Sequence, residues 1–317
     1  MEPRILAVPD FFVDVVMHPG LGVAELLEAI GETARLGGGN ILVRGVVRPG
    51  GNAGNSARVL AALGRRVTLG VVGSSLHAAV ARVMLRGVEV VHLGGSGECF
   101  SAILEVGSGE RLVNIMFSDK GCLSPIGRGG EVDEALAGLL SRGWEACLAV
   151  NIAAWGSPRG ASRLPWRRCR ILLLDTSDAR GRDYGELLEA LRSMRGAAYT
   201  VISLNECELA YHARHLSARS PREALEALAE ATGAVVCLHT PRSAVCEPGG
   251  VEQHNIFYTD NPATSTGAGD AWNAGLIDAL LSGLSLRDAL LHAHRVAACY
   301  VAKGAPCTRS QLGGARR

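Results

Sequence analysis

A run of small residues that ends in an aspartate lies in the last third of the chain. Thr266 precedes Gly267, Ala268 and Gly269, and Asp270 follows at once. Glycine has no Cβ atom, so an anion can approach the backbone of such a run closely. If a helix begins there, its first N–H groups are unpaired and attract negative charge. Like charges repel, so the carboxylate is no ligand for that anion; it can instead accept a proton from a hydroxyl that attacks a phosphorus atom held by those N–H groups.

The residues after Asp270 predict this helix. Trp272, Leu276 and Leu280 recur at helical spacing, and Gly283 stands where a C-terminal cap is expected. A simpler interpretation is a glycine turn with an ordinary first-turn aspartate, which a helix dipole favours in any protein. A bare Gly-Ala-Gly-Asp favours the simpler interpretation.

A second segment of this kind follows Pro49. Gly51, Asn52 and Asn55 lead into an apolar run that closes at Gly64, which again predicts a helix N-terminus. Residues three apart share one helix face, so both amides can donate to and accept from the same hydroxyl-bearing molecule. Taken alone, the segment is equally a glycine turn with an asparagine cap.

Acidic residues follow predicted strands. Strand 4–8 leads into Asp10 and Asp14, and strand 170–175 ends in Asp175. Open α/β sheets bind ligands at the carboxyl ends of their strands, where a carboxylate can accept hydrogen bonds from sugar hydroxyls. Either early aspartate can also cap a turn. We prefer that role for Asp10, expect Asp14 to contact a ligand, and assign no role to Asp175.

Strands and helices alternate along the chain, as in strand 67–73, helix 76–86 and strand 88–93, which predicts a parallel sheet. Residues 99–106 and 111–117 alternate around Gly107-Ser108-Gly109 and predict a hairpin. With 317 residues and 48% hydrophobic residues, the chain can bury a large core.

A net charge of +1 gives no support to a nucleic-acid partner. No apolar run is long enough to span a membrane, and the first residues resemble a strand rather than a signal peptide. We therefore expect a cytoplasmic protein without a membrane partner. The 9 cysteines show no CxxC pair and favour buried free thiols over a disulfide framework, with a Cys237–Cys246 bond across a hairpin as the less favoured alternative.

Together, the two glycine segments resemble the signatures of the PfkB (ribokinase-like) carbohydrate kinase family. Residues 260–275, DNPATSTGAGDAWNAG, are similar to its DTTGAGDxFxxG motif, and residues 51–55 to its GGNxxN motif. The resemblance implies one ribokinase-like α/β/α domain over residues 1–317. It further implies a mostly parallel central sheet and a small β-sheet lid inserted at about residues 15–48 and 98–117.

The resemblance also implies roles for individual residues. Asp270 corresponds to the catalytic base, and Gly267, Ala268 and Gly269 to the anion hole for the transferred phosphoryl group. The substrate contacts are Asp14, Gly51, Asn52 and Asn55.

Residues 205–208 resemble a third motif of the family, N-x-x-E, which organises magnesium and phosphates through water. Asn205, Glu208 and Thr266 are therefore the predicted nucleotide contacts, and Glu208 the predicted metal residue. The alternative for residues 205–208 is a helix start with Asn205 as its cap.

Three positions depart from the family pattern. Thr264 replaces an aspartate associated with a monovalent-cation loop, so dependence on such a cation stays open. Trp272 replaces the usual phenylalanine. Residues 237–243, CLHTPRS, lack the glycines of the family's TLGxxG nucleotide loop, which leaves the donor nucleotide open.

The expected reaction is transfer of the γ-phosphoryl group of ATP, with Mg²⁺, to a hydroxyl of a sugar or sugar phosphate. The segment at Asp175, DTS, is similar to phosphofructokinase and tagatose-phosphate kinase members and favours a phosphorylated substrate. Basic residues on or near the lid are expected to be solvated, at a dimer surface, or bound to such a phosphate; they are Arg44, Arg48, Arg111 and Lys120. The alternatives are a nucleoside kinase and a non-catalytic sugar-binding relative. The family also implies a homodimer through the lid.

Overall fold

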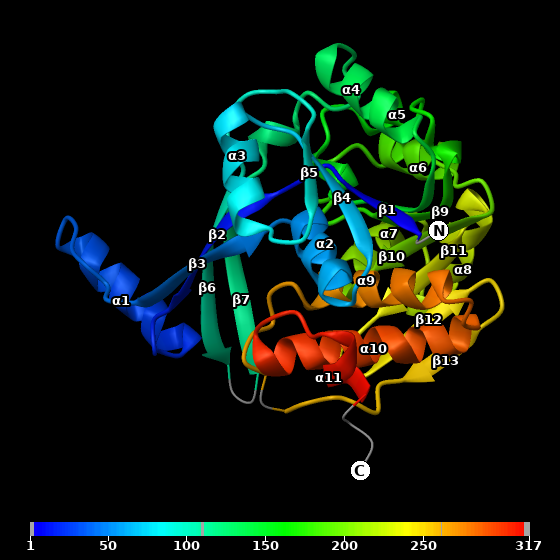
Figure 1. Cartoon of the computed structure of the whole chain (residues 1–317). Helices are drawn as coiled ribbons and strands as arrows, with labels where there is room; N and C mark the ends of the chain where they lie inside the picture. The colour runs from blue at the N-terminus through cyan, green and yellow to red at the C-terminus, as the bar shows by residue number, and fades with distance from the viewer. Residues whose placement is uncertain (1–2, 109–110, 261, 314–317) are drawn as a thin grey trace.

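A computed structural model describes residues 3–108, 111–260 and 262–313. Two sheets with helices around them make up this part of the chain (Figure 1). None of its helices combines the length and the apolar character that crossing a membrane requires.

The larger sheet has 9 strands in the order β13-β12-β11-β10-β9-β8-β1-β4-β5. Neighbours from β5 to β11 pair in parallel, and β12 and β13 add an antiparallel edge. The strands are β1 (Arg4–Val8), β4 (Arg66–Val71), β5 (Glu89–His92), β8 (Trp144–Ala149), β9 (Cys169–Asp175), β10 (Tyr199–Leu204), β11 (Val235–His239), β12 (Ser243–Glu247) and β13 (Val251–His254).

Helices cover both faces of this sheet because its strands are apolar on both sides. Leu6 and Val8 of β1 belong to one buried cluster, whereas Ile5 and Ala7 belong to another. Alternate side chains of a strand point to opposite faces, so the sheet lies between two cores. The result is the predicted α/β/α arrangement of three layers.

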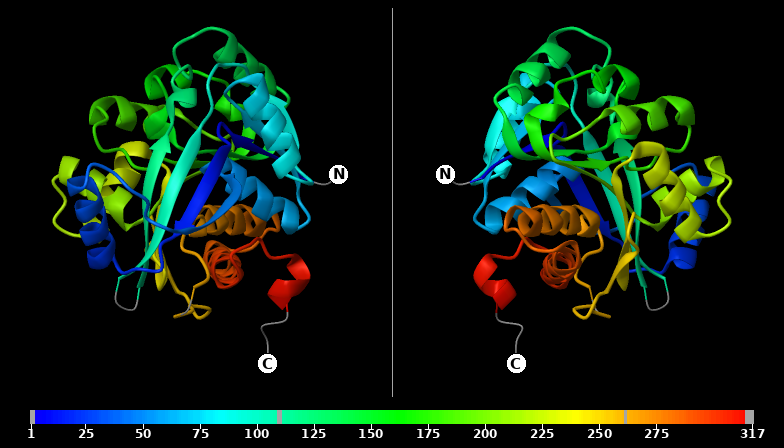
Figure 2. Two further views of the ribbon diagram at one scale, coloured as in Figure 1. Left: turned by 90° about the vertical axis from the view of Figure 1, so that its left-hand side faces the viewer. Right: turned by 90° about the vertical axis from the view of Figure 1, so that its right-hand side faces the viewer.

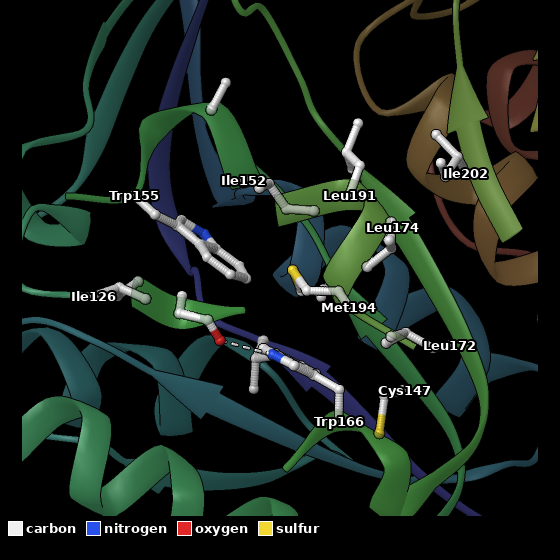
Figure 3. Close-up of a cluster of buried hydrophobic side chains, with 14 of the residues drawn as sticks. Ile126, Cys147, Ile152, Trp155, Trp166, Leu172, Leu174, Leu191, Met194 and Ile202 are labelled. Atoms are coloured by element: carbon white, nitrogen blue, oxygen red, sulfur yellow. Dashed lines mark hydrogen bonds between the residues drawn. The ribbon is translucent and has the colours of Figure 1, made fainter. Parts of the chain in front are cut away.

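The first core contains the stacked Trp155 and Trp166 (Figure 3). It packs under α4 (Glu131–Leu140), α5 (Pro158–Ala161), α6 (Tyr184–Ser193), α7 (Glu206–His215) and α8 (Pro221–Thr232). The second core packs under α2 (Asn52–Ala62), α3 (Ser75–Met84), α9 (Ala268–Leu281), α10 (Leu286–Lys303) and α11 (Arg309–Gly313).

The smaller sheet has 4 strands in the order β3-β2-β6-β7 and lies with α1 (Val23–Arg35) beside the main body (Figures 1 and 2). Its strands are β2 (Phe12–His18), β3 (Arg44–Gly50), β6 (Phe100–Ser108) and β7 (Arg111–Asp119). Strand β1 ends at Val8 and β2 begins at Phe12, so the carboxyl ends of the main strands face the smaller sheet. A lid function for this sheet stays a prediction.

Most predicted elements occur within a few residues of their expected bounds. Strands β6 and β7 form the expected antiparallel hairpin, although the Gly109 part of its predicted turn lies outside the described residues.

The cysteine prediction was wrong. Four disulfides join Cys99 to Cys122, Cys147 to Cys169, Cys237 to Cys246, and Cys299 to Cys307, and Cys207 is free and exposed. The Cys237–Cys246 pair lies directly opposite across β11 and β12, as the less favoured alternative had it. The other pairs depend on which segments meet in the fold, and the spacing of cysteines in the sequence does not reveal that.

Candidate active site

Helix α9 begins at the predicted glycine run. Gly267 is its N-cap residue with φ 83°, a left-handed conformation that glycine adopts without strain. A Cβ atom at Gly267 would lie 2.8 Å from the hydroxyl oxygen of Tyr300, so the close approach also requires glycine. The N–H of Ala268 lies 3.4 Å from the carbonyl of Ser265, and those of Gly267 and Gly269 have no partner in the described chain. The segment is a helix N-terminus with free amide donors.

Asp270 lies in the first turn of α9 and is 8% exposed. Its Oδ2 accepts a hydrogen bond of 2.9 Å from Nδ2 of Asn55, and its carbonyl accepts one of 3.1 Å from the hydroxyl of Ser56. Both donors come from the first turns of α2, which begins at the second predicted segment. The fold thus brings two motifs together that lie far apart in the chain.

The early aspartates also reach this place. Asp14, on β2, is 4% exposed and packs against Gly50, where an added Cβ would overlap its carboxylate. Asp10 is fully buried, and its carboxylate accepts the N–H of Ala53 at 2.6 Å. Asp10 lies outside helix α2 and accepts a hydrogen bond from an N–H group in its first turn, so it caps the helix. The sequence predicted only that Asp10 caps a turn.

Gly51 and Asn52 stand at the start of the same helix. Gly51 is the N-cap with φ 80°, and an added Cβ would lie 3.0 Å from the backbone nitrogen of Phe12. Asn52 is the first residue of α2 and is half-buried. Strand β2 and the N-terminus of α2 are thus in direct contact.

The carboxylates at this edge have high pKa values. Burial raises the pKa of Asp270 well above its ordinary value, the hydrogen bond from Asn55 opposes the rise, and nearby aspartate charges add to it. Burial raises the pKa of Asp14 to about 6, against the nearby charge of Arg48. Both groups are therefore better proton acceptors than an exposed aspartate.

Lys120 lies at the centre of the polar network at the strand ends, although the sequence grouped it with the basic residues on or near the lid. Its ammonium donates to Oδ1 of Asn151 at 2.9 Å and to the hydroxyl of Ser177 at 3.1 Å. The amide of Asn151 donates to Asp10. Asp175, 6% exposed, accepts from the backbone N–H of Ser177 at 2.8 Å.

Asn273, on α9, connects that helix to the polar network at the strand ends. It donates to Asp175 at 2.9 Å and accepts from the hydroxyl of Ser203 at 2.6 Å. Asn273 stands three residues after Asp270, so both side chains lie on one face of the helix. Burial raises the pKa of Asp175 to about 6, with hydrogen bonds from Ser177 and Asn273 in opposition.

Asn205 and Glu208 form a capping box at the start of α7. The side chain of Asn205 accepts the N–H of Glu208 at 3.0 Å, and Oε2 of Glu208 accepts the N–H of Asn205 at 2.9 Å. This is the local geometry of the helix-start alternative. Burial and the neighbouring Asp175 also raise the pKa of Glu208 to about 8.

The residues present fit a magnesium ion held largely through water. Within the described residues, no group of three or more histidine, cysteine or acidic side chains is arranged to hold a metal directly. Oε1 of Glu208 has no hydrogen-bond partner in the same part of the chain. Mg²⁺ keeps several waters and needs only one or two carboxylates besides substrate phosphates, so a single carboxylate at this position is compatible with it.

The smaller sheet contacts the segment just before the glycine run. The hydroxyls of Thr264 and Thr266 donate to Oε1 of Glu105, on β6, at 2.7 and 2.9 Å. Arg48, on β3, donates to Thr264 at 3.4 Å, and Asn114, on β7, to Thr266 at 3.3 Å. The hydroxyl of Thr264, at the position where the family pattern has aspartate, thus contacts a carboxylate on β6, and the hydroxyl of Thr266 contacts the same carboxylate.

A tight hairpin stands where the family has its nucleotide loop. Strand β11 ends at His239, and the N–H and hydroxyl of Thr240 turn back to the carbonyl of Ser243. The His239 ring stacks on Trp272 with centroids 4.6 Å apart. Burial lowers the pKa of His239 to about 4, so the ring is neutral near pH 7.

Several residues of the site were not predicted as such. Asp10 and Asn151 lie two residues after strands of the main sheet, and Asp175 is the last residue of β9. A polar residue at the carboxyl end of a strand was the signal that the sequence offered. It identifies a shared site only when β1, β8 and β9 are known to be neighbours in the sheet. No comparable signal pointed to Glu105.

Residues 173–311 match the model of a family described as pfkB family carbohydrate kinase. The resemblance to the PfkB family is confirmed. The match covers α9 with its glycine run and the Asn205–Glu208 segment. No functionally curated protein matches the chain.

Solved structures confirm the predicted ribokinase-like fold. An adenosine kinase from Sinorhizobium meliloti is 20% identical with a TM-score of 0.71, over 99% of this chain and 98% of its own. A ribokinase from Arabidopsis thaliana complexed with ribose and ATP is 17% identical with a TM-score of 0.69, over 98% of each chain. Phosphofructokinase-2 from Escherichia coli is 13% identical with a TM-score of 0.70, over 99% of this chain and 97% of its own.

Proposed function

We propose that this PfkB-like protein transfers the γ-phosphoryl group of ATP to a hydroxyl of a sugar or sugar phosphate. One observation carries the proposal: the buried carboxylate of Asp270 lies in the first turn of a helix at whose start the N–H groups of Gly267 and Gly269 have no partner in the described chain. A proton acceptor and an anion-binding site therefore occupy the same turn. Asp14, Asn52 and Asn55 supply polar groups beside them for the acceptor's hydroxyls.

In this reaction the acceptor oxygen attacks the γ-phosphorus and forms a new O–P bond. The bond from that phosphorus to the β–γ bridging oxygen breaks, and ADP leaves with the electron pair. Asp270 takes the hydroxyl proton, and the N–H groups of Gly267, Ala268 and Gly269 stabilise charge on the phosphoryl oxygens. A raised pKa suits Asp270 for this role, because a base works best when its pKa approaches the working pH.

The nucleotide end of the site is assigned to Asn205, Glu208 and Thr266. Glu208 would hold Mg²⁺ through water, and the ion would neutralise the nucleotide's phosphates when bound. The free Oε1 of Glu208 supports this. The hairpin at His239 lacks the glycines of the family's nucleotide loop, so the sequence does not identify the nucleotide base. The product screen described below therefore compares ATP with other donors.

A nucleoside is the second candidate acceptor, since an adenosine kinase is among the similar folds. We favour a sugar or sugar phosphate because Arg48, 18% exposed in its side chain, and the half-buried Arg58 lie near Asp14. Guanidinium groups in that position can pair with a phosphate on the acceptor.

The test is a product screen with the purified full chain, Mg²⁺ and ATP, ADP or GTP as donor. Sugars, sugar phosphates and nucleosides serve as acceptors, and mass spectrometry detects the added phosphate. We expect a phosphate ester with a sugar or sugar phosphate. Phosphorylation of nucleosides alone would support the second candidate, and no ester with any acceptor and donor would contradict the kinase proposal.

We also propose that two copies pair through the outer face of the smaller sheet. Val15, Val47 and Phe117 lie in one cross-strand row and are 37%, 63% and 61% exposed. Phe100, in the adjacent row, is 49% exposed. Asp14 and Arg48 are next to this row in sequence and point to the other face, toward the site. A contiguous apolar face of this kind is typical of an interface, and a second copy offers the same apolar surface in return.

Sedimentation of Val47→Glu tests this pairing, with Val83→Glu as the matched control on exposed α3. We expect a dimer for the unchanged chain and the control, and a monomer for Val47→Glu. A monomeric unchanged chain, or a dimer that survives Val47→Glu, would contradict it.

A further inference from the structure

Lys120 is one of only two lysines in the chain, and its surroundings set it apart. It follows β7 directly and reaches to the strand ends of the main sheet, where it donates to Asn151 and Ser177. An ammonium group has three N–H donors. Within the described residues two of them have partners, so one is left for a ligand.

The two residues that hold Lys120 have unusual backbones. Asn151 has φ 55° and Ser177 has φ 58°, and the described chain contains one further non-glycine residue with positive φ, Ser217. Such conformations cost free energy and persist where the surrounding structure imposes them, often at functional sites. Two of these three residues, Asn151 and Ser177, accept hydrogen bonds from the Lys120 ammonium group. The fold therefore constrains the position of that group closely.

Lys120 faces acidic groups from three directions. Asp10 follows β1, Asp175 and Asp178 lie at the end of β9 and after it, and Glu208 lies on α7. Its positive charge acts against a high pKa at Asp10, Asp175 and Glu208 and adds to the low pKa of Asp178. It therefore stands between the acceptor side of the site and the side assigned to the metal and nucleotide.

We propose that Lys120 binds the phosphoryl group in transfer, with its remaining N–H directed to an oxygen of the nucleotide's terminal phosphate. This rests on the proposed kinase function. Asn151 and Ser177 fix the ammonium beside the strand ends, and the anion-hole amides of α9 approach the phosphate from another element. A lysine is suited to this place because its compact charge can meet a phosphate oxygen while it keeps two neutral partners.

The first arm of the test compares binding of ATP, ADP and AMP by calorimetry, with Mg²⁺, to the unchanged chain and to Lys120→Met. We expect ATP binding to weaken by about 10- to 100-fold, the scale of a hydrogen bond to a charged group, and AMP binding to change little. Lys120→Arg should recover most of the loss. Arg66→Met, which removes an exposed cation from the amino end of β4, is the matched control and should bind all three normally.

The second arm uses the acceptor found in the product screen and follows kcat/KM against pH. Removal of the Lys120 charge raises the pKa values of Asp10 and Asp175, so the acidic limb should move to higher pH in Lys120→Met. It should stay in place in Lys120→Arg and Arg66→Met. A residue that only holds strand ends together would lower the melting temperature without moving this limb.

If Lys120→Met does not fold, lysine modification of the unchanged chain decides the question. Pyridoxal phosphate and borohydride label accessible lysines, and labelling of exposed Lys303 shows that the reagent acts. We expect ATP, but not AMP, to protect Lys120. Equal effects on ATP and AMP in either experiment would overturn the proposal while leaving the kinase function intact. A chain that binds no nucleotide would remove both.

Discussion

Helix α9 carries two buried aspartates in opposite environments. Asp270, in its first turn, receives one side-chain hydrogen bond, from Asn55, and other carboxylates lie near it. Asp278, in its last turns, is 1% exposed and receives donors from Arg65 at 2.6 Å, Arg309 at 2.7 Å and His292 at 2.9 Å. The two residues have the same side chain on the same helix, so their difference comes from the surroundings alone.

Their pKa values differ in direction for this reason. Burial acts to raise the pKa of Asp278, but hydrogen bonds from His292, Arg309 and Arg65 outweigh it and hold the pKa below its ordinary value. Asp270 lacks such cations and its pKa is raised. The carboxylate of Asp278 therefore joins α9 to α10, to α11 and to the loop between α2 and β4. The carboxylate of Asp270 is available to accept a proton.

The largest expected effect is on turnover. Asp270→Asn removes the proton acceptor and keeps the shape of the side chain, so we expect kcat to fall by roughly 10²- to 10⁴-fold. The melting temperature should not fall, because a buried and poorly paired charge is lost. Steady-state kinetics and thermal unfolding measure the two; unchanged kcat would remove Asp270 from the base role.

Substitution of Asp278 should have the opposite pattern, with a loss of stability and little change in turnover. Asp278→Asn leaves Arg65, Arg309 and His292 without their anion, and we expect the free energy of unfolding to fall by about 3 kcal/mol. Turnover of the folded protein should change little. Urea unfolding and kcat measure these, and a large loss of kcat at full stability would show that the two ends of α9 do not divide their roles in this way.

A smaller effect is expected at the single hydrogen bond of Asp270. Asn55→Ala removes the donor that opposes the rise of its pKa, so kcat at pH 7 should fall by about 10-fold. The acidic limb of the kcat profile should move to higher pH. Ser56→Ala is the control, since it removes a hydrogen bond to the carbonyl of Asp270 and leaves the carboxylate untouched. Equal effects of the two variants would contradict the assignment.

The smallest effects are in the dependence on pH. Asp14 and Glu208 have pKa values of about 6 and about 8, and both act as carboxylates in the proposed site. We therefore expect kcat/KM to rise from pH 6 to pH 8. A rate profile that is flat over this range would contradict these assignments.

Stability should respond to pH with the opposite sign. A carboxylate whose pKa is raised by folding contributes stability below its unfolded value, and the contribution is lost as the pH rises through its folded value. Asp14 and Glu208 should thus lower the melting temperature between about pH 4 and pH 8. The contribution of Asp278 is present above its unfolded pKa and is lost only in acid, so Asp278→Asn should leave this slope unchanged.

Much of the fold follows from local sequence, because helix starts and buried strands have short-range patterns. Asp270 and Asn55 were placed correctly at two helix starts, since glycine runs before apolar helices mark such positions. Sequence could not show that the two side chains meet, because the contact depends on how α2 packs against α9. It could not place Lys120 either, since that requires the order of β1, β8 and β9 in the sheet. The partners in the other three disulfides, apart from Cys237–Cys246, could not be predicted for the same reason.

The central claim is that Asp270 and the amides beside it deliver a phosphoryl group to a hydroxyl rather than to water. Single-turnover experiments with ATP labelled at the γ-phosphate, with and without the acceptor found by the screen, test it most directly. The account predicts that the label leaves ATP rapidly only when the acceptor is present and then appears in a phosphate ester. Release of labelled inorganic phosphate at the same rate with or without the acceptor would contradict it.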